Sequence, residues 1–435
     1  MVTQNSAHGE GLLSHTVDTL TMGQQPVEAS EPERTPNRPE RDVFAKAYRY
    51  TRAEEATALG LHPYFRAIAA QDGGVVTVDG REMIITGSND YLGLTQDPRL
   101  KRAARAALDD FGTSCTGSRF LTGTLTLHEE LELRLAAFMR KPAALTFSAG
   151  FLGSLSVVAA IAGRHDILYY DRENHASLVD GARLSFATLR KFEHGDMDDL
   201  ERHLARDASR GGGRLIVTDG VFSMSGHIAK LPEIVAIARR YGARVMVDDA
   251  HASGVLGPTG RGTAEHFGLE AEVDLILGTF SKSFASVGGF IAGEAKVVNW
   301  IKHMARPFIF TAALPAMQMA AVLEALEIMD AEPWHRERLW DNVGLLHGGL
   351  AALGFDTLGT ESPIVPILIG PDDLAMAFWR SAWDAGVFTT PALPPSVPAG
   401  RAIVRTSVNA NHTREQLERL LEVFAVAGRG LGMIA

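Results

Sequence analysis

Several polar residues that can do chemistry follow directly after short apolar runs in the chain. Lys282 follows VDLILGT, Asp248 and His251 accompany ARVMVD, His175 comes after DILYY, and Ser223 comes after RLIVTD. A lysine amine can form a Schiff base with an aldehyde. A buried carboxylate can pair with a protonated ring nitrogen, and histidines and hydroxyls can hydrogen-bond the rest of a ring. These residue types together predict a site for a cofactor with a reactive aldehyde.

The elements that must position these residues alternate between apolar runs and amphipathic helices. In LPEIVAIARRYG, Ile234, Ile237, Ala238 and Tyr241 recur at helical spacing, and Gly242 ends the helix. Near-continuous apolar strands separated by helices predict a mostly parallel sheet covered on both faces. Ligands of such sheets bind beyond the carboxyl ends of the strands. The expected strands are 143–147, 166–170, 214–219, 243–248 and 273–279.

A further turn, SAGF, follows the run AALTF and precedes a helical stretch from about Leu152. An ordinary tight turn is one interpretation. The other is a phosphate site, because the first N–H groups of a helix are free and its dipole is positive there. Together with Lys282 and Asp248, a phosphate site completes the requirements of pyridoxal 5'-phosphate (PLP).

Other cofactors and partners are less well supported by the sequence. No GxGxxG follows a strand and no Walker A pattern occurs, and Asp248 and His251 have no third zinc ligand nearby in the sequence, so no metal is expected. The net charge of -10 argues against nucleic acid as a partner. The single cysteine, Cys115, fits a cytoplasmic location, and no run is long enough to span a bilayer.

The composition also predicts the domain organisation. Residues 1–40 are polar and rich in Pro, Glu and Ser, which indicates a disordered leader. We expect an N-terminal segment at 41–95 and a large cofactor-binding domain at 96–330. Residues 331–435 change to helices with a few short strands and predict a smaller α+β domain.

The motifs DRENHASL, DGVFSM, VDDAH and TFSKSF resemble the α-oxoamine synthase family of PLP-dependent enzymes. GLHPYFRAI, GSNDYLGL, SCTGSRFLTGTLTLHEELE and SKSFASVGGF resemble its bacterial members that condense L-serine with palmitoyl-CoA. The similarity runs from about Gly60 to the C-terminus. It implies an α/β fold of the PLP-dependent transferase fold type I, which is aspartate-aminotransferase-like.

The resemblance implies roles around the cofactor. Lys282 would bind PLP covalently and move protons at the substrate Cα, and Asp248 would pair with the pyridinium nitrogen. His251 would hydrogen-bond the phenolic oxygen, and His175 would stack on the ring. Further contacts to the ring or phosphate are expected from Gly150, Phe151, Ser223 and Thr279.

The resemblance also implies substrate and partner contacts. Asn89 and Arg405 match residues that handle the substrate carboxylate, for which an arginine fork is suited. An arginine in a surface ion pair is the alternative for Arg405. Thr311 matches a position that reaches the phosphate of the neighbouring subunit, so a homodimer with shared active sites is expected. A weak peripheral contact with a membrane is compatible with a lipid substrate, although no motif indicates it.

The implied reaction is a decarboxylative condensation of L-serine with palmitoyl-CoA, the first step of sphingolipid synthesis. The segment GVFTTPALPPSVPAGRA lacks the Asn-Pro pair expected of enzymes with these substrates and carries Thr389, Thr390 and Pro391 instead. A related synthase that uses glycine or alanine, or an acyl carrier protein, is therefore an alternative. A non-catalytic relative and an aminotransferase or aldolase of the same fold are further alternatives.

Overall fold

The computed structural model of the chain describes residues 42–435, which divide into two units with the boundary between His62 and Pro63. The leader predicted at 1–40 lies outside the described residues. The described part of the first unit holds two short helices, α1 (Ala45–Tyr48) and α2 (Arg52–Ala58), and no residue of either helix is buried. The second unit, Pro63–Ala435, carries the sheets and the candidate site.

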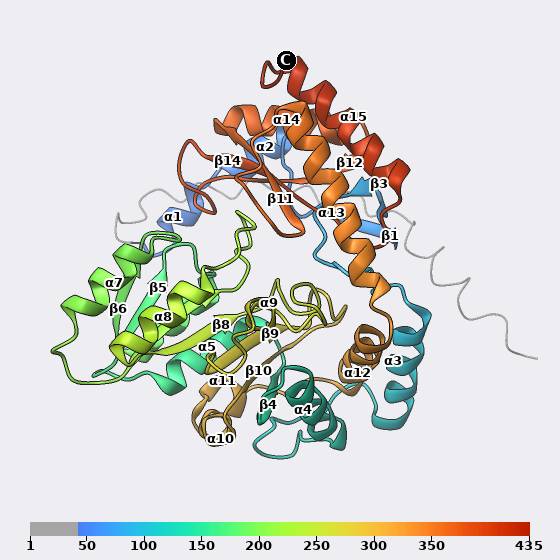
Figure 1. Cartoon of the computed structure of the whole chain (residues 1–435). Helices are drawn as coiled ribbons and strands as arrows, with labels where there is room; N and C mark the ends of the chain where they lie inside the picture. The colour runs from blue at the N-terminus through green and yellow to red at the C-terminus, as the bar shows by residue number, and fades with distance from the viewer. Residues whose placement is uncertain (1–41) are drawn as a thin grey trace, which may run out of the picture. The chain divides into compact units, whose positions relative to one another are not determined.

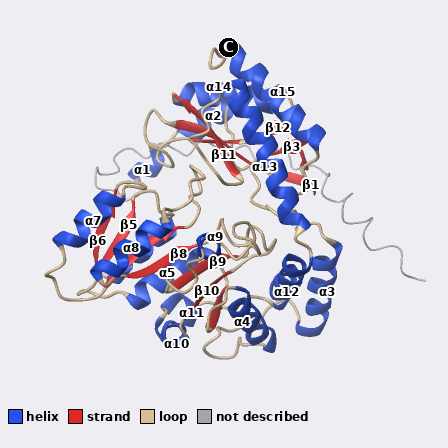
Figure 2. Cartoon of the chain, in the orientation of Figure 1, coloured by secondary structure: helices blue, strands red, loops and turns tan. Residues whose placement is uncertain are grey.

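A seven-stranded sheet forms the centre of the second unit, in the order β4-β10-β9-β8-β7-β5-β6 (Figure 2). β10 is antiparallel to both of its neighbours, and the other pairs are parallel. The strands are β4 (Ala143–Phe147), β5 (Ile167–Asp171), β6 (Thr188–Phe192), β7 (Arg214–Asp219), β8 (Arg244–Asp248), β9 (Leu275–Thr279) and β10 (Gly289–Gly293).

Both faces of this sheet are buried, because alternate residues of each strand enter different hydrophobic clusters. Tyr169 of β5 packs in one cluster, while Leu168 and Tyr170 pack in the other. The second cluster includes residues of α5 (Gly150–Ile161), α6 (Ala176–Ser185) and α10 (Ala295–Met304). The predicted mostly parallel sheet with helices on both faces is therefore confirmed (Figure 1).

Two smaller sheets complete the unit. Their strands are β1 (Ile68–Asp72), β2 (Val75–Val78), β3 (Arg81–Ile85) and β12 (Val387–Phe388) in one, and β11 (Ile364–Gly370), β14 (Ala402–Ser407) and β13 (Thr390–Ala392) in the other. β12 pairs with β3, so the first small sheet joins chain segments from both ends of the unit. The division at 95/96 and 330/331 stays a prediction.

The remaining helices are amphipathic or buried elements around these sheets (Figure 1). They are α3 (Pro98–Phe111), α4 (Thr126–Phe138), α7 (Met197–Arg206), α8 (Leu231–Tyr241), α9 (Thr263–Phe267), α11 (Arg306–Ile309), α12 (Ala316–Ala331), α13 (Trp334–Leu353), α14 (Asp372–Asp384) and α15 (Arg414–Gly430). α8 ends at Gly242, whose φ of 63° is left-handed and costs glycine little.

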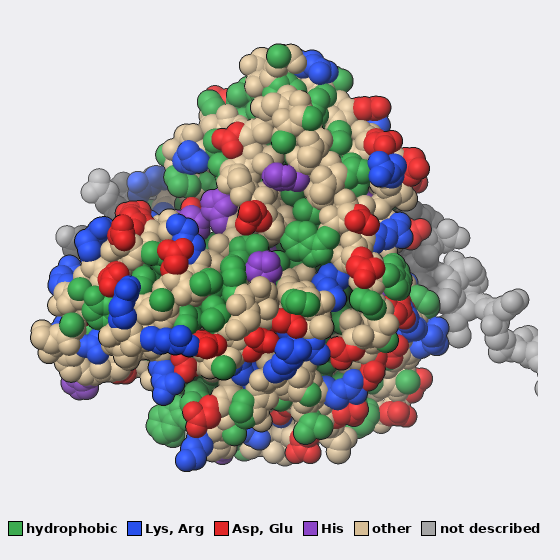
Figure 3. All heavy atoms as spheres, viewed as in Figure 1, with side chains coloured by type: hydrophobic (Ala, Val, Ile, Leu, Met, Phe, Trp, Pro, Cys, Tyr) green, Lys and Arg blue, Asp and Glu red, His purple; other side chains and the backbone are tan. Residues whose placement is uncertain are grey.

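Acidic and basic side chains are interspersed over the face of the molecule in Figure 3. Many of them form exposed pairs, such as Arg239 with Glu272 and Arg240 with Glu201. Exposed pairs contribute little to stability, about 0–1 kcal/mol each. The electrostatics that bear on function are therefore those of buried groups.

Candidate active site

A cavity of about 320 Å³ lies beyond the carboxyl ends of the central strands. The turn before α5, the ends of β7, β8 and β9, and the loop after β9 all contribute to its wall. The sequence-predicted residues that line it are Gly150, Phe151, His175, Asp248, His251, Thr279 and Lys282. The structure therefore brings together seven of the eleven residues singled out from the sequence.

Lys282 lies in the loop after β9 and lines this cavity, between two buried phenylalanines in the sequence. Phe280 and Phe284 are fully buried, and their rings meet edge to face at 5.6 Å between centroids. This packing orders the short loop in which Lys282 lies. Burial lowers the pKa of Lys282 to about 8, although the charge of Asp248 opposes the change. About a tenth of the amine is therefore neutral, and nucleophilic, at pH 7, far more than for an ordinary lysine.

Asp248 and His251 flank the lysine at the end of β8. Asp248 Oδ1 accepts the N–H of Ala250 at 3.0 Å, and Ser154 Oγ lies 3.4 Å from its other oxygen. Burial places the pKa of His251 well below its usual range, and the charge of Lys282 adds to this effect. His251 is thus neutral, and its Nδ1 lies 2.7 Å from the hydroxyl of Tyr91.

The start of α5 forms the opposite wall of the cavity. Its N-cap residue, Ala149, has no side chain that could cap the first N–H groups of the helix. The positive end of the helix dipole therefore lies at the cavity wall with no capping side chain. A Cβ on Gly150 would lie 2.7 Å from Thr279 Oγ1. Thr279 Oγ1 also contacts Ser281 Oγ at 2.8 Å. The helix beginning, two hydroxyls and the close approach at Gly150 form a cradle suited to phosphate.

His175 caps α6 at the edge of the cavity. Its Nδ1 accepts the N–H of Ser177 at 3.3 Å. Burial lowers the pKa of His175, so the ring is neutral and its Nε2 carries the proton. The ring of Phe151 lies edge to face with it, at 6.2 Å between centroids.

Asn89, Ser223 and Arg405 form a second group beside the cavity. Arg405 is buried, donates from Nη2 to Asn89 Oδ1 at 2.9 Å and donates from Nε to the carbonyl of Ser223 at 2.7 Å. The charge of Arg405 lowers the pKa of both Lys282 and His251. Arg405 is therefore not an arginine in a surface ion pair, and Ser223 contributes its main chain rather than its hydroxyl to this group.

Thr311 is not brought to the Lys282 cavity within one chain. It lines a small separate cavity with Arg119 and Phe308. Its expected contact with the phosphate of a neighbouring subunit stays a prediction.

Comparison with known proteins identifies the family. Residues 81–424 match the model of the aminotransferase class I and II family. The chain belongs to that family. Its relatives include serine palmitoyltransferase of Bacteriovorax stolpii, which is 46% identical over 84% of this chain and 87% of the relative. Another is 8-amino-7-oxononanoate synthase of Thermoanaerobacter pseudethanolicus, which is 43% identical over 88% of this chain and 96% of the relative.

Solved structures of this aminotransferase family agree with the sequence relatives. A serine palmitoyltransferase from S. paucimobilis, with a bound PLP–myriocin aldimine, superposes with a TM-score of 0.87 at 35% identity. The match covers 91% of this chain and 100% of that one. The predicted aspartate-aminotransferase-like fold is confirmed. The predicted α-oxoamine synthase resemblance is also confirmed, since both named sequence relatives are synthases of this kind.

The chain is therefore a PLP-dependent acyltransferase of the α-oxoamine synthase type. The residues present fit this cofactor: a lysine amine with a pKa of about 8, a buried carboxylate and a phosphate cradle meet in one cavity. Residues 42–435 contain no group of three or more His, Cys, Asp or Glu side chains that could hold a metal ion. In the same part of the chain, no helix is long and apolar enough to cross a membrane.

Sequence reasoning missed three residues of this site. Tyr91 lies inside the motif GSNDYLGL, but nothing local showed that its hydroxyl would meet His251. Ser154 lies one helical turn into α5 and reaches Asp248. Asp219 lines the cavity at the end of β7, and its place at the end of an apolar run is the signal that could have found it.

Proposed function

We propose that the chain condenses L-serine with palmitoyl-CoA to give 3-ketodihydrosphingosine, the first step of sphingolipid synthesis. The relatives named serine palmitoyltransferase support this choice among the α-oxoamine synthases. In the net reaction, a C–C bond forms between the serine Cα and the acyl carbonyl carbon, and the C–S bond of the thioester breaks. The Cα–H bond and the bond between Cα and the carboxylate also break, carbon dioxide leaves, one proton returns to Cα, and another protonates the thiolate of CoA.

The observation that carries this proposal is a groove of about 1020 Å³ that meets the Lys282 cavity at His175, which lines both. Apolar side chains suit a long acyl chain. Arginines suit the phosphates of CoA, because the guanidinium fork pairs bidentately with phosphate. The groove offers both kinds of side chain: the apolar Met224, Leu368, Val397 and Ile403, and the basic Arg401, Arg172 and Arg183, of which the last two are paired with Glu193 and Asp180.

Five residues of the site bind the cofactor or the amino acid, move a proton, or orient another of these residues in the proposed reaction. When bound, PLP supplies an aldehyde for the amino group and a ring that accepts electrons from Cα. Lys282 removes the Cα proton and later returns it. The carboxylate of Asp248 holds the ring nitrogen, and neutral His251 holds the phenolic oxygen. Arg405, oriented by Asn89, binds the carboxylate of serine.

The assembly is proposed to be a homodimer. Thr311 then completes the phosphate site of the neighbouring subunit. Two observations fit this arrangement: Thr311 lies outside the Lys282 cavity of its own chain, and Phe310 beside it is exposed. The cytoplasmic location predicted from the sequence stays a prediction.

A second candidate is an activity of the 8-amino-7-oxononanoate synthase type, with alanine or glycine as the amino acid and another acyl thioester as the donor. The relatives with that name support it. Both candidates use the same cofactor residues. They differ in the side chain of the amino acid and in the acyl group that enters the groove.

The experiment measures thiol release by the PLP-loaded protein from palmitoyl-CoA with L-serine, glycine or L-alanine. We expect release with L-serine and 3-ketodihydrosphingosine in the mass spectrum. Lys282→Ala should abolish release, whereas Lys296→Ala, which changes an exposed lysine on α10, should not. Release with alanine and another thioester, but not with serine, would favour the second candidate.

A further inference from the structure

Two buried carboxylates lie side by side beneath the cavity, and the proposed reaction uses only one of them. Asp219 ends β7 and Asp248 ends β8, and the two residues are register partners in the parallel pair. Register partners on neighbouring parallel strands project to the same face of the sheet. Both side chains line the Lys282 cavity, and both are buried.

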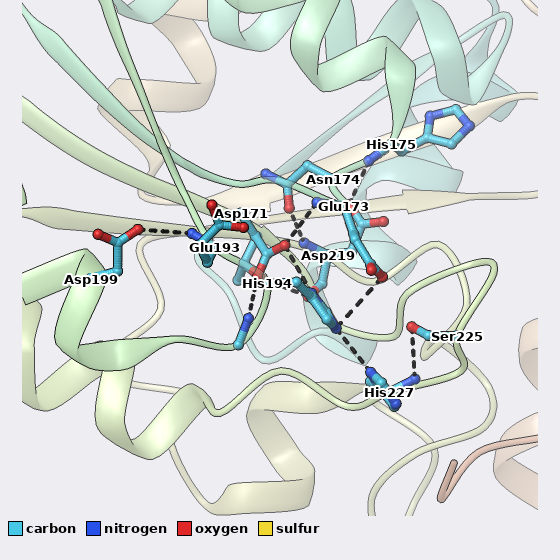
Figure 4. A network of polar contacts seen from close by, with 12 residues as sticks. Asp171, Glu173, Asn174, His175, Glu193, His194, Asp199, Asp219, Ser225 and His227 are labelled. Atoms are coloured by element: carbon cyan, nitrogen blue, oxygen red, sulfur yellow. Dashed lines mark hydrogen bonds and ion pairs between the residues drawn. The ribbon is translucent and has the colours of Figure 1, made fainter. Parts of the chain in front are cut away.

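Asp219 is hydrogen-bonded to the segment that carries His175 (Figure 4). Its Oδ1 accepts the N–H of His175 at 3.3 Å. Asn174 anchors the same segment to β7, because it accepts the N–H of Asp219 at 3.2 Å and donates to the carbonyl of Val217 at 2.7 Å. The main chain at the start of α6 is therefore held against β7 by three contacts.

A third carboxylate, Asp171, lies next to a pair of hydrogen-bonded histidines (Figure 4). His227 Nε2 lies 2.7 Å from the carbonyl of Leu358, which can only accept, so His227 donates there. His194 Nε2 lies 2.9 Å from His227 Nδ1, and His194 Nδ1 lies 2.9 Å from Asp171 Oδ1. Burial lowers the pKa of His194, but the hydrogen bond and charge of Asp171 raise it more, so Asp171 favours the cationic form of His194.

The charged groups that face Asp219 are Asp248 from β8, Asp171 from β5 and Lys282 from the loop after β9. Lys282 faces Asp248 as well, and His194 Nδ1 lies 2.9 Å from Asp171 Oδ1. Two adjacent buried carboxylates do not both ionise readily. Burial raises the pKa of Asp219 well above its usual range, and the charge of Asp248 raises it further.

We propose that Asp219 is a positioning residue, a neutral carboxylic acid that holds the main chain of His175 and leaves the negative charge beneath the cofactor to Asp248. The inference rests on the PLP chemistry of the chain and on the His175 role in the proposed function, not on the identity of the acyl donor. A neutral acid beside Asp248 keeps the charge that faces the ring nitrogen at one. Its oxygen also accepts from the main chain that carries the His175 ring, which would face the cofactor.

The test compares Asp219→Asn and Asp219→Ala in the PLP-loaded protein without substrates. The first readout is the induced circular dichroism of bound PLP, which reports how the ring is held. The second is the pH midpoint of the visible absorbance of bound PLP, which changes as the nitrogen joined to Lys282 gains or loses a proton. Neither readout needs an acyl donor, so failure of this inference is distinguishable from failure of the proposed substrates.

Asparagine keeps an oxygen acceptor and is neutral, so Asp219→Asn should keep both the dichroism and the midpoint. Asp219→Ala should lose most of the dichroism, because His175 loses its acceptor. If Asp219 were ionised, removing its charge near Lys282 would lower the midpoint in the Asn variant by about one pH unit or more. That result would overturn the neutral assignment, and unchanged dichroism in the Ala variant would overturn the positioning role.

Ile216→Val is the matched control for a change in β7. Ile216 is buried in the same strand and lies outside the lining of the Lys282 cavity. This variant should leave both readouts unchanged. With L-serine, Asp219→Asn should keep kcat within about threefold of the wild type, and Asp219→Ala should lower kcat more than tenfold. If the Ala variant does not fold, the Asn variant and its midpoint still decide the neutral assignment.

Discussion

Arg405 and Asn89 are joined by a hydrogen bond of 2.9 Å although 316 positions separate them in the chain. The contact brings a residue of β14 to a loop that follows β3 near the start of the second unit. Because Arg405 also donates to the carbonyl of Ser223, its guanidinium is fixed from two sides. A fixed guanidinium is already oriented for a carboxylate, which reduces the entropy lost when the substrate binds.

Replacing Arg405 with lysine should therefore weaken amino-acid binding. Lysine keeps the positive charge but loses the planar fork and the contacts that orient it. We expect KM for L-serine to rise about 10- to 100-fold, which corresponds to about 1.5–3 kcal/mol for hydrogen bonds to a charged group. Steady-state kinetics with varied serine measure the effect. Arg414→Lys on α15, which changes an exposed arginine, serves as the control and should leave KM unchanged.

Capture of PLP by the apoprotein should depend on pH through Lys282. The pKa of this amine is about 8, and only the neutral form attacks an aldehyde. Below that pKa the neutral fraction falls about tenfold per pH unit, and above it the fraction is constant. The rate of PLP capture, followed by absorbance after rapid mixing, should rise with pH and level off near pH 8 to 9. A rate that does not change between pH 6 and 8 would contradict the assignment.

Gly150→Ala should weaken PLP binding. A Cβ at this position would lie 2.7 Å from Thr279 Oγ1 and 3.0 Å from Thr279 Cβ, so the helix start or the threonine has to move. We expect the dissociation constant of PLP to rise about tenfold or more, which equals about 1.4 kcal/mol. Fluorescence titration of the apoprotein measures it.

The control for this substitution is Gly344→Ala in α13, where an added Cβ meets no atom within 4 Å. That substitution should leave PLP binding unchanged. It should stabilise the protein by about 0.5–1 kcal/mol, because alanine loses less entropy than glycine in a helix. Equal PLP affinities in the two variants would show that the close approach at Gly150 has no effect on the cofactor.

Tyr91→Phe should destabilise the protein and disturb the cofactor site. The tyrosine hydroxyl lies 2.7 Å from Nδ1 of buried His251, and its removal leaves that nitrogen without this partner. We expect a loss of about 1–3 kcal/mol in the free energy of unfolding and a lower affinity for PLP. Urea unfolding and PLP titration measure the two effects.

Tyr170→Phe provides a matched comparison. Tyr170 is equally buried, but its hydroxyl has no hydrogen-bond partner among the described residues. Removing an unpaired buried hydroxyl should be neutral or stabilising. A larger loss of stability in the Tyr170 variant than in the Tyr91 variant would contradict the importance of the contact with His251.

The residues around the ring could be predicted from sequence because parallel strands end at one edge of a sheet. Lys282, Asp248, His251 and His175 each follow an apolar run, so a local pattern placed them together. Helix α8 was predictable for a similar reason, since its periodicity and its terminal Gly242 are local signals. The start of α5 was expected near Leu152 but lies at Gly150. Helix ends are decided by capping rather than by periodicity.

Contacts that join distant segments had no local signal. Tyr91 meets His251 only because the segment after β3 packs against the end of β8. The pairing of β12 with β3 could not be predicted either, because β12 is two residues long. Strand β10 was not predicted either, because its sequence GFIAG is short and consists mostly of small residues. Its pairing with β4 and β9 is a contact between distant segments.

The position of β10 bears on the order in which the chain folds. β4 is an edge strand whose neighbour in the sheet is β10, and residues 148–288 separate the two strands. During synthesis β4 leaves the ribosome long before β10 does. The backbone N–H and C=O groups of β4 therefore stay without their strand partner until β10 is made. Pairing across such a separation is slow, and an exposed apolar strand favours aggregation. β4 is therefore the strand of this sheet that stays without its neighbour for the longest stretch of synthesis.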